Sequence, residues 1–429
     1  MTRTVCMLVT NCVANDPRVR REAAALRKSG VDVVLVGVNS DERADDRVVE
    51  GCHVVIVAHP RRYVAKIRSW WAAVREIVPG KKGQHPDSGK PDSTTENVGN
   101  GFVRLLRDGV NILNVLWLNA ALARTAVAQS AGIYHCHDLD TLLAGCLAKL
   151  LTGGKVVYDC HELFTEQYRP GAKTWLWKGF YSGLERWLIR YTDLRLAVCD
   201  SIGKWMSLEY RTAPSVTVRN CPHLQPSPES PSRPAGEKII LYHGAFLPDR
   251  GIEQLIASAR YLSRAKIVLR GLGPLETHLR ALVGRHGLQD LISFAPPVAV
   301  SELVTAAAAA DIGVVLYLPV CLNARFSLPN KLFEYMMAGL AIVGSDLPEL
   351  RRIIRDSVYP VGAVCDPHDP QDLARAINEL VKDDQLLARL KHNAREAAVS
   401  LFNWETESRR LLSAYDSLIV KSRTPSCVP

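Results

Sequence analysis

Short runs of hydrophobic residues alternate along the chain with longer segments in which hydrophobic positions recur at helical spacing. The short runs predict strands that are buried on both faces, and the longer segments predict helices that cover them. The first helix is predicted at 17–29, with Pro17 in its first turn and Gly30 after its end. A strand, a helix and a second strand in such close succession favour a parallel sheet. In the first half of the chain the predicted strands are 4–10, 31–37, 54–58, 132–136, 155–159 and 194–198.

Two polar segments interrupt this alternation. Residues 221–237 hold five prolines in 17 positions, which predicts a linker between two domains. Residues 80–101 are polar and rich in glycine, proline and serine, so we expect a mobile loop inserted in the first domain. We interpret this loop as a solvated insertion, and a lid over a substrate is the alternative.

The alternation of strands and helices resumes after the linker and ends in helical patterns over 370–420. The predicted fold class is therefore α/β, with two Rossmann-like βαβ domains at 1–220 and 238–403 that face a central cleft. In such sheets, ligands bind at the carboxyl ends of the strands. The second series of predicted strands is 238–244, 266–271, 292–295, 312–318 and 341–345, and the helices between them are 251–262, 274–286, 300–309 and 331–338.

The composition limits the class of protein. The chain has 429 residues, enough for two or three domains with large cores. Its 47% hydrophobic and 23% charged residues exclude a disordered or collagen-like chain. Eleven scattered cysteines without a CxxC pair indicate reduced thiols rather than a disulfide framework. We find no signal-peptide pattern. No uncharged apolar run approaches the length of about 18 residues that a membrane span needs, so we expect a soluble cytoplasmic protein.

The net charge of +9 fits an anionic small molecule, nucleic acid or an anionic membrane as a partner, and it does not separate them. Because no nucleic-acid-binding module is recognised, we do not expect a nucleic-acid partner. Seven of the eight tryptophans lie in the first half, several of them beside Arg or Lys. We interpret them as parts of amphipathic helices packed on the sheet, and a basic, aromatic face that touches a membrane is the alternative.

Candidate anion-binding residues follow the first strand of the second half. Gly244 and Gly251 flank a loop that leads into a predicted helix, where backbone N–H groups and Arg250 favour a negative charge. An ordinary loop with a surface arginine is the alternative. After the next strand, Arg270 precedes Gly271 and Gly273, which would let a flat base or a ribose approach the backbone; two glycines alone are weak evidence.

The segment 327–339 places a cation and a carboxylate on one helical face, because Lys331 and Glu334 are three residues apart. Asn330 is a plausible N-cap for this helix. The lysine and the helix terminus suit a diphosphate, and the carboxylate suits ribose hydroxyls, so the pair fits a nucleotide sugar. A surface ion pair is the alternative.

In the first half, His135, His137 and Asp138 end one predicted strand, and Asp159, His161 and Glu162 end the next. Adjacent parallel strands deliver these side chains to one edge of the sheet, where we expect polar groups aimed into the cleft. Buried structural hydrogen bonds and a metal site are the alternatives, and the spacing of the histidines does not favour a metal.

Six segments in order resemble the retaining GT-B glycosyltransferases known as glycosyltransferase family 4, over nearly the whole chain. They are VTNCVANDPRVRREAAALRKSGVDVVLVG, HCHDLDTLLAG with VVYDCHELFTEQ, VTVRNCP, LYHGAFLPDRGIEQLI with LRGLGPLETHLR, SLPNKLFEYMMAGLAIVGSDLPEL and FNWETESRRLLSAY. The resemblance implies an N-terminal acceptor domain and a C-terminal donor domain. It also implies that a final helix, 404–420, crosses back to the first domain.

The resemblance also implies roles for individual residues. Arg250 would bind the diphosphate of the donor, Glu334 its ribose, and His137 would lie near the transferred sugar. With Lys331, these are the expected catalytic residues. The expected donor-binding residues are Gly244, Arg270, Gly271, Gly273, Asn323 and Asn330, and the expected acceptor-side residues are Asn15, Asp16, Arg18, Asp138, His161 and Glu162.

The chain departs from the family pattern at two positions. Many members have an arginine directly after the glycine that Gly244 matches, and here Ala245 stands there. The first glutamate of the E-x7-E motif is replaced by Phe326. Lys331 is the candidate to restore the positive charge, and Asn323 or Arg325 is the candidate to replace the contact with the sugar.

The resemblance implies transfer of a sugar from a UDP- or GDP-linked donor to a hydroxyl or other nucleophile of a small-molecule, lipid or polysaccharide acceptor. We expect retention at the anomeric carbon, with neither a metal nor a cofactor besides the nucleotide sugar. The alternatives are a sugar-nucleotide epimerase or hydrolase and a non-catalytic partner subunit. A nicotinamide-dependent oxidoreductase is disfavoured, because no glycine-rich turn follows the first strand. We expect the protein in the cytoplasm and leave open a place at the inner face of the membrane.

Overall fold

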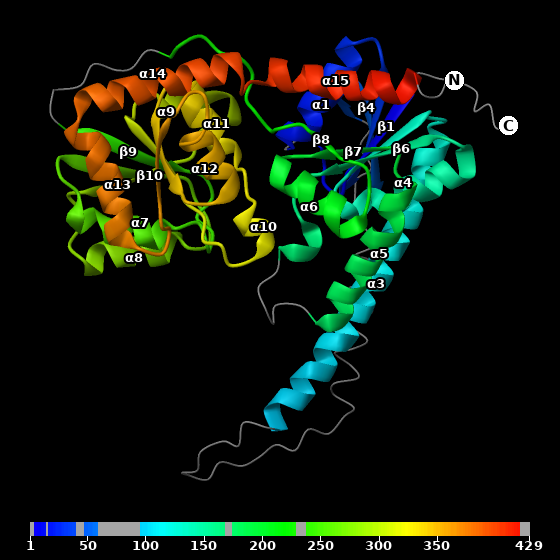
Figure 1. The fold of residues 1–429 in the computed structure, drawn as a ribbon. Coiled ribbons are helices and arrows are strands. Elements are labelled where there is room, and N and C mark those ends of the chain that lie inside the picture. Colours follow the sequence, from blue (N-terminus) through cyan, green and yellow to red (C-terminus); the bar gives the residue numbers. More distant parts are fainter. Residues whose placement is uncertain are drawn as a thin grey trace. The chain divides into compact units, whose positions relative to one another are not determined.

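The computed structural model describes residues 4–13, 16–39, 47–58, 95–167, 174–228 and 237–420. They fall into two compact units, one made of Met1–His161 and Tyr168–Arg195 and the other of Glu162–Gln167 and Leu196–Pro429. Each unit is built around a mostly parallel sheet covered by helices (Figure 1). This agrees with the two α/β halves expected from the hydrophobic pattern.

The first sheet has the strand order β3-β4-β2-β1-β5-β6-β7-β8. Its central strand β1 pairs in parallel with β2 on one side and β5 on the other, whereas β3 runs antiparallel to its neighbour β4. Residues 5–8 of β1 are at most 1% exposed, which explains their purely apolar sequence. The strands are Thr4–Leu8 (β1), Asp32–Asn39 (β2), Arg47–Val49 (β3), Cys52–Ala58 (β4), Ile133–His137 (β5), Lys155–Cys160 (β6), Leu194–Ala197 (β7) and Val216–Thr217 (β8).

The helices up to residue 210 include one that the sequence analysis did not anticipate. The helix α3 (Thr95–Ala128) begins inside the segment expected to be a mobile loop, so this prediction is wrong for 95–101; residues 80–94 lie outside the described part. Once a helix is nucleated, each further residue adds a hydrogen bond, and polar N-terminal turns can continue an apolar helix. The other elements are α1 (Pro17–Lys28), α4 (Leu139–Thr152), η1 (Phe164–Glu166), α5 (Trp175–Leu188), η2 (Ile189–Tyr191) and α6 (Asp200–Tyr210).

Part of α3, Arg107–Ala128, is long and apolar enough to cross a membrane by length and composition, although the sequence analysis expected no such segment. Its mean hydropathy is 1.3, and 28% of it is buried. Two buried polar residues tie it to neighbouring elements. Asn119 donates to the carbonyl of Asp140 on α4 over 2.9 Å, and Asp108 accepts a hydrogen bond from the side chain of Thr174. The helix is therefore docked on the first unit along part of its length.

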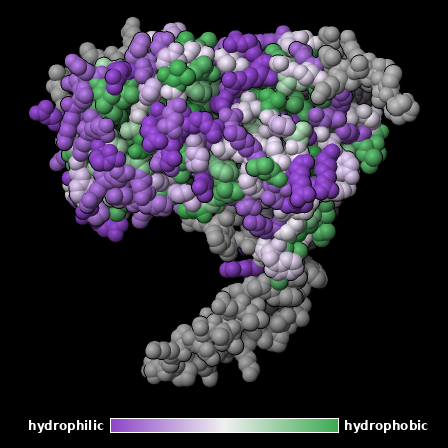
Figure 2. Space-filling model, viewed as in Figure 1, coloured by the Kyte–Doolittle hydropathy of each residue, from purple (hydrophilic) through white to green (hydrophobic). Residues whose placement is uncertain are grey.

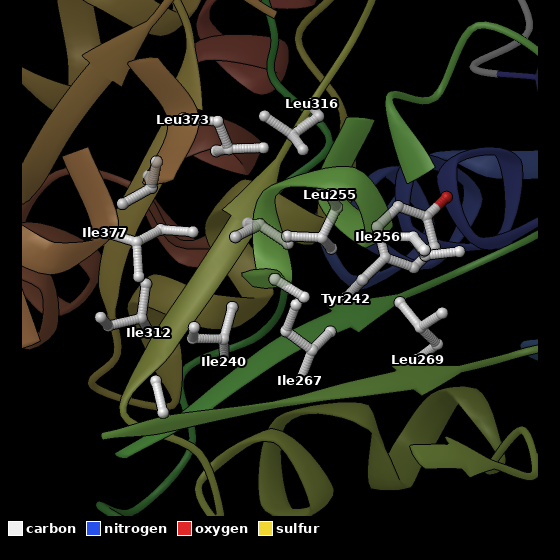
Figure 3. Packing of buried hydrophobic residues seen from close by; sticks show 14 of the residues in the cluster. Ile240, Tyr242, Leu255, Ile256, Ile267, Leu269, Ile312, Leu316, Leu373 and Ile377 are labelled. Carbon is white, nitrogen blue, oxygen red and sulfur yellow. The ribbon is translucent and has the colours of Figure 1, made fainter. Parts of the chain in front are cut away.

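The second sheet has the order β11-β10-β9-β12-β13-β14, and each strand is parallel to its neighbours. Aliphatic side chains from these strands and from α7 and α13 form its core (Figure 3). Its strands are Lys238–His243 (β9), Ala265–Arg270 (β10), Ile292–Ala295 (β11), Ile312–Val315 (β12), Ala341–Ser345 (β13) and Gly362–Cys365 (β14). Its α-helices are Ile252–Ser258 (α7), Glu276–Arg285 (α8), Leu303–Ala307 (α9), Leu322–Arg325 (α10), Asn330–Met337 (α11), Pro348–Ile354 (α12), Pro370–Lys382 (α13), Asp384–Ser400 (α14) and Trp404–Val420 (α15). Two 3-10 turns complete it, Ala259–Tyr261 (η3) and Val300–Glu302 (η4).

The division into units does not coincide with the expected linker at 221–237. The described part of that segment, 221–228, contains no helix or strand, and 229–236 lie outside the described residues. The unit boundary at Leu196 falls within β7, while β8 still pairs with β7 in the first sheet. The expected final helix is present as α15, where Glu407 accepts a hydrogen bond from the backbone N–H of Arg219. Its crossing to the first domain stays a prediction.

Candidate functional site

Two loops of the second unit lie against each other through their backbones. The N–H of Gly244, after β9, donates to the carbonyl of Arg270 over 3.0 Å, and Phe246 donates to Leu272 over 3.0 Å. A Cβ atom on Gly271 would lie 2.0 Å from the carbonyl oxygen of Gly244. Since no side chain fits there, glycine is required for this close approach. These loops are at the carboxyl ends of β9 and β10, where parallel sheets bind ligands.

Lys331 lies at the start of α11 and reaches the first of these loops. Its Nζ is 3.8 Å from the centre of the Tyr242 ring, and a Cβ on Gly244 would lie 3.2 Å from it. The side chain is buried, and burial together with the charge of Arg250 lowers its pKa to about 7. Lys331 forms no ion pair with any residue in the described ranges, so the expected alternative of a surface pair with Glu334 is wrong. Its position beside Gly244 supports the idea that it replaces the arginine absent at Ala245.

Arg250 is the second cation of this region. Its guanidinium carbon lies 4.2 Å above the ring of Tyr317, a cation–π contact, and the structure gives it no carboxylate partner among the residues it describes. The loop that carries it is fixed by a hydrogen bond from Leu318 N–H to the Asp249 carbonyl, 3.0 Å long. A cation held by an aromatic face rather than by a carboxylate keeps its charge available for an anion.

Glu334, on α11, contacts a residue that the sequence analysis did not propose. Its Oε2 is 2.8 Å from Nε2 of His243, the last residue of β9. His243 is 2% exposed, and its backbone N–H donates to the hydroxyl of Tyr335 over 2.7 Å. Burial lowers the pKa of His243, which favours the neutral ring. The signal in the sequence was its place at a strand end directly before Gly244.

The remaining expected donor residues have other contacts. Arg270 donates to the carbonyl of Ala306 over 3.0 Å. Asn330 is the first residue of α11, and Pro329 takes the N-cap position that was expected for Asn330. Gly273 allows a second close approach, since a Cβ there would lie 2.6 Å from the carbonyl oxygen of Phe246.

Asn323, on α10, uses both ends of its amide within the second unit. Its Oδ1 accepts from the N–H of Leu163 over 2.9 Å, and its Nδ2 donates to Oε2 of Glu162 over 3.3 Å. Glu162, expected on the acceptor side, thus belongs by its contacts to the unit that carries α10. The role of Asn323 toward a donor sugar stays a prediction.

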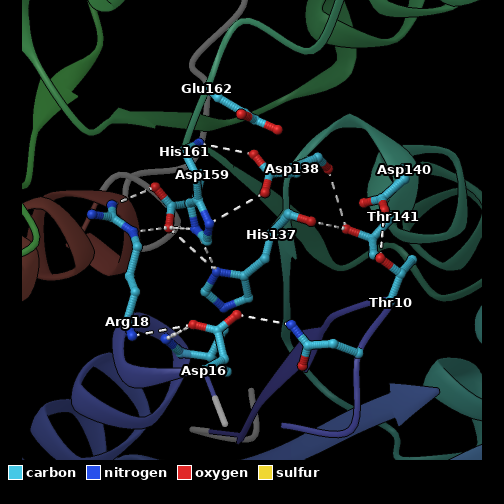
Figure 4. A network of polar contacts seen from close by, with 12 residues as sticks. Thr10, Asp16, Arg18, His137, Asp138, Asp140, Thr141, Asp159, His161 and Glu162 are labelled. Atoms are coloured by element: carbon cyan, nitrogen blue, oxygen red, sulfur yellow. Dashed lines mark hydrogen bonds and ion pairs between the residues drawn. The ribbon is translucent and has the colours of Figure 1, made fainter. Parts of the chain in front are cut away.

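In the first unit, the ends of β5 and β6 bring a second cluster together (Figure 4). The guanidinium of Arg18, on α1, holds the Asp159 carboxylate by two hydrogen bonds of 2.6 and 2.9 Å, and both side chains are buried. Burial disfavours the charged Asp159, but Arg18 and His161 overcome this effect and hold its pKa well below the usual range. Arg18 therefore keeps the buried carboxylate of Asp159 negatively charged at this edge of the first sheet.

Two histidines contact Asp159. Its Oδ2 is 2.8 Å from Nε2 of His161 and 3.3 Å from Nδ1 of His137. His161 also lies 3.2 Å from the carboxylate of Asp138; although burial opposes its charge, the two aspartates raise its pKa to about 9. Burial and the neighbouring His135 lower the pKa of His137 to about 3. The cluster thus pairs a charged His161 with a neutral His137, whose Nε2 is buried and has no hydrogen-bond partner within the described ranges.

His135, which was expected among the polar residues at this strand end, and Glu22, which was not expected, join this cluster. Glu22, His135, His137 and Asp159 offer ligand atoms within 4.8 Å of one another, as a metal site would. However, the rings of His135 and His137 are stacked 4.3 Å apart at 18°, and a metal ion cannot lie in the plane of both rings. Arg18 already supplies a cation, 3.1 Å from Glu22 and 2.6 Å from Asp159. Burial and Asp159 raise the pKa of Glu22 to about 8.

The first loop of this unit is only partly described, and Asn15 lies outside the described residues. Asp16 caps α1, because its side chain accepts from the N–H groups of Arg18 and Val19 over 3.1 and 3.2 Å. It also accepts from Asn11 over 2.9 Å. Asp16 and Arg18 therefore both have structural contacts, and their roles on the acceptor side stay predictions. The structure thus presents two candidate sites, one in each unit.

Comparisons with known proteins give a consistent result. Residues 225–397 match the family model described as Glycosyl transferases group 1, and residues 73–221 match the one described as Glycosyltransferase Family 4. The chain is 33% identical over 135 residues to a D-inositol 3-phosphate glycosyltransferase of a Nocardioides species, a match that covers 31% of this chain and 27% of that protein. The match spans less than half of the length of the first curated relatives found.

Solved structures resemble the whole chain. A sucrose-phosphate synthase from Thermosynechococcus elongatus superposes with a TM-score of 0.71 at 17% identity, covering 97% of this chain and 99% of that one. Anabaena HepE, solved in complex with UDP and glucose, gives a TM-score of 0.66 at 14% identity, with 96% and 99% covered. At such low identities these likenesses establish a shared fold.

Proposed function

Because two glycosyltransferase family models match residues 225–397 and 73–221, we propose that this chain is a glycosyltransferase that resembles family 4 and transfers a sugar from a nucleoside-diphosphate donor, UDP- or GDP-linked, to a nucleophile of its acceptor. The second unit would bind the donor and the first unit the acceptor, and we assign His137 to the transferred sugar. The UDP bound by Anabaena HepE supports a nucleotide donor.

The observation that carries this proposal is the pair of cations at the carboxyl edge of the second sheet. Lys331 and Arg250 both rest on tyrosine rings, and neither is neutralised by a carboxylate among the residues that the structure describes. Glu334 lies on the same helical face as Lys331 and offers hydrogen-bond acceptors. In a nucleoside diphosphate, the diphosphate could bind the two cations and the ribose hydroxyls could donate hydrogen bonds to Glu334.

The chemical step breaks the bond between the anomeric carbon and the diphosphate oxygen, so negative charge grows on the leaving nucleoside diphosphate. Arg250 and Lys331 would stabilise that charge without rearranging, which is electrostatic preorganisation. We propose retention of configuration, with the leaving phosphate taking the proton of the acceptor as the new glycosidic bond forms. Two fixed cations can replace a metal in this role, and the proposal therefore includes neither a metal nor a cofactor.

We also propose that the first unit touches an anionic membrane through α5. Its exposed residues include Trp175 and Trp187, which are 76% and 55% exposed, and the basic Lys178 and Arg186; the exposed Arg190 follows in the 3-10 turn η2. In Figure 2 hydrophobic residues lie beside strongly hydrophilic ones over α3 and α5. Exposed tryptophans among basic side chains are typical of a surface that lies at the lipid headgroups. A lipid acceptor or a membrane-attached acceptor would then be within reach.

The first experiment measures thermal stabilisation by a panel of UDP-, GDP-, ADP- and dTDP-sugars, with and without EDTA. A ligand at 100 times its dissociation constant stabilises a protein by about 2.7 kcal/mol, so the true donor should raise the melting temperature clearly. We expect one nucleotide series to act, and EDTA not to matter. The absence of a shift with every donor would contradict the proposal and favour a non-catalytic partner subunit.

A second experiment uses the donor so identified. Arg250→Ala and Glu334→Ala are each expected to slow turnover by roughly 100-fold while the protein stays folded, because each removes a contact to the donor. Arg264→Ala, outside the site, is the control and should keep the wild-type rate. Product formation in the absence of any acceptor would favour the epimerase or hydrolase alternative instead.

A further inference from the structure

His243 connects the end of β9 to two consecutive residues of α11. Its backbone N–H donates to the hydroxyl of Tyr335 over 2.7 Å, and its ring nitrogen Nε2 lies 2.8 Å from Oε2 of Glu334. The ring is 2% exposed, so solvent does not compete for the contact. One residue thus fixes both the distance between strand and helix and the direction of the Glu334 side chain.

The protonation state of this contact follows from its partners. A carboxylate only accepts hydrogen bonds at neutral pH, so Nε2 of His243 must carry the hydrogen. Burial lowers the pKa of the ring, which keeps it neutral. Its other nitrogen, Nδ1, is buried and has no hydrogen-bond partner among the residues that the structure describes. His243 is therefore a donor with a single available hydrogen, and that hydrogen points to Glu334.

Packing prevents the ring from turning away. The rings of His243 and Tyr335 lie 4.4 Å apart, and Tyr335 in turn packs on β12, where a Cβ at Gly313 would lie 2.4 Å from its ring. The missing side chain of Gly313 makes room for Tyr335, which holds the histidine in place.

His243 binds only one of the two carboxylate oxygens of Glu334. The side chain of Glu334 is 16% exposed, and its Oε1 has no hydrogen-bond partner in the part of the chain that the structure describes. Without His243, Glu334 would be free to turn toward other donors, among them Lys331 one turn away on the same helix face. A single neutral donor is enough to orient it and leaves its negative charge intact.

We propose that His243 is a positioning residue, which holds Oε2 of Glu334 so that Oε1 faces the ribose hydroxyls of the donor nucleotide. This inference rests on the proposed function, in which Glu334 binds ribose. It predicts that the preference for a ribose over a sugar without its hydroxyls depends on His243 as much as on Glu334.

The test compares the dissociation constants of UDP and GDP with those of their 2′,3′-dideoxy analogues by titration calorimetry. In the wild-type protein we expect the ribose form of the preferred nucleotide to bind about tenfold tighter or better, because hydrogen bonds to a charged carboxylate are strong. Glu334→Ala should abolish this ratio. His243→Leu should reduce it at least threefold, whereas His243→Gln, whose amide nitrogen reaches the position of Nε2, should keep most of it.

The outcomes separate the inference from its premise. If Glu334→Ala removes the preference but His243→Leu keeps it, His243 does not position the carboxylate, and the ribose role of Glu334 stands. If Glu334→Ala keeps the preference, Glu334 does not bind ribose, and the inference falls together with that part of the proposed function. Should His243→Leu fail to fold, His243→Asn takes its place, because its shorter amide does not reach Glu334; a wild-type ratio in this variant would overturn the inference.

Discussion

At the scale of single residues, burial decides what Lys331 can do. In the sequence it stands three residues before Glu334, and this spacing left a surface ion pair as the alternative to a nucleotide-sugar site. In the structure it is 9% exposed, it lies over Tyr242, and its pKa falls to about 7 through burial and the charge of Arg250. A diphosphate would reverse this effect, because a bound anion favours the charged amine.

Donor binding should therefore be linked to proton uptake. Below pH 7 the amine of Lys331 is already charged. Above pH 7, binding of the nucleotide sugar must be accompanied by uptake of a proton from solution by this amine. We expect the affinity for the UDP- or GDP-sugar to fall as the pH rises from 7 to 9. Titration calorimetry in buffers of different ionisation enthalpy measures the proton directly. The Lys331→Arg variant, whose charge does not titrate in this range, should take up none; equal uptake in both proteins would contradict the assignment.

His161 should contribute a pH-dependent part of the stability of the first unit. Asp138 and Asp159 raise its pKa from 6.5 to about 9, against the effect of burial. The folded state thus holds a proton that the unfolded state loses near pH 6.5. Its contribution is fully present below pH 6.5 and is lost as the pH rises to 9. The free energy of unfolding, measured in urea from pH 6 to 9, should therefore fall less steeply in His161→Gln than in the wild type. Parallel curves for the two proteins would argue against a charged His161.

At the scale of elements, glycines decide how the two loops of the donor site meet. Gly271 has a φ of +148°, and its missing side chain lets the loop after β10 touch the loop after β9. In the helix α5, by contrast, a glycine only lowers the helix propensity. Gly183 lies on the exposed side of α5, with nothing within 4 Å of the place where a Cβ would stand.

The same substitution should accordingly have opposite effects at these two positions. Gly271→Ala should destabilise the protein by about 1–3 kcal/mol or more and weaken nucleotide binding, because the backbone at Gly244 must move. Gly183→Ala should stabilise by about 0.5–1 kcal/mol through a higher helix propensity and leave binding unchanged. Thermal unfolding and nucleotide titration of the two variants decide this, and wild-type binding by Gly271→Ala would show that the loops need not touch.

At the scale of the whole molecule, the net charge of +9 takes on meaning through its placement. The exposed side of α5 carries basic residues and tryptophans, while its one acidic residue, Glu185, is buried and accepts a hydrogen bond from Tyr158. Such a surface is attracted to anionic lipids, and its tryptophans can enter the headgroup region.

Vesicle binding should depend on these tryptophans. We expect the protein to sediment with vesicles that contain anionic phosphatidylglycerol, less so at high salt, and weakly with vesicles of phosphatidylcholine alone. Exchange of Trp175 and Trp187 for serine should lower binding several-fold. Leu208→Ser, at a leucine on α6 that is 81% exposed, is the matched control and should bind as the wild type does. Equal binding by both variants would exclude α5 as the membrane surface.

The sequence by itself determined the architecture, because buried parallel strands and their covering helices leave a periodic record of hydrophobic residues. The order of the strands along the chain and the glycines after β9 and β10 could be read in this way. Local spacing within a short segment also predicted that Lys331 and Glu334 share one helix, which the structure has as α11, while the roles of Arg250, Lys331 and Glu334 toward a donor stay predictions. The helical start of α3 could not be predicted from the sequence, because its polar residues continue a helix that is nucleated and packed further along the chain.

Only the tertiary structure decided which groups meet over long distances in the chain. His243 and Glu334 are 91 residues apart, and Arg18 and Asp159 are 141 residues apart. No local pattern records such a pair. The pairing also sets the charges, since a buried group takes its protonation state from neighbours that the fold supplies. The sequence therefore showed which titratable groups are present, and the fold decided that the pKa of Lys331 falls to about 7, that His161 is charged and that Glu334 is held by a histidine.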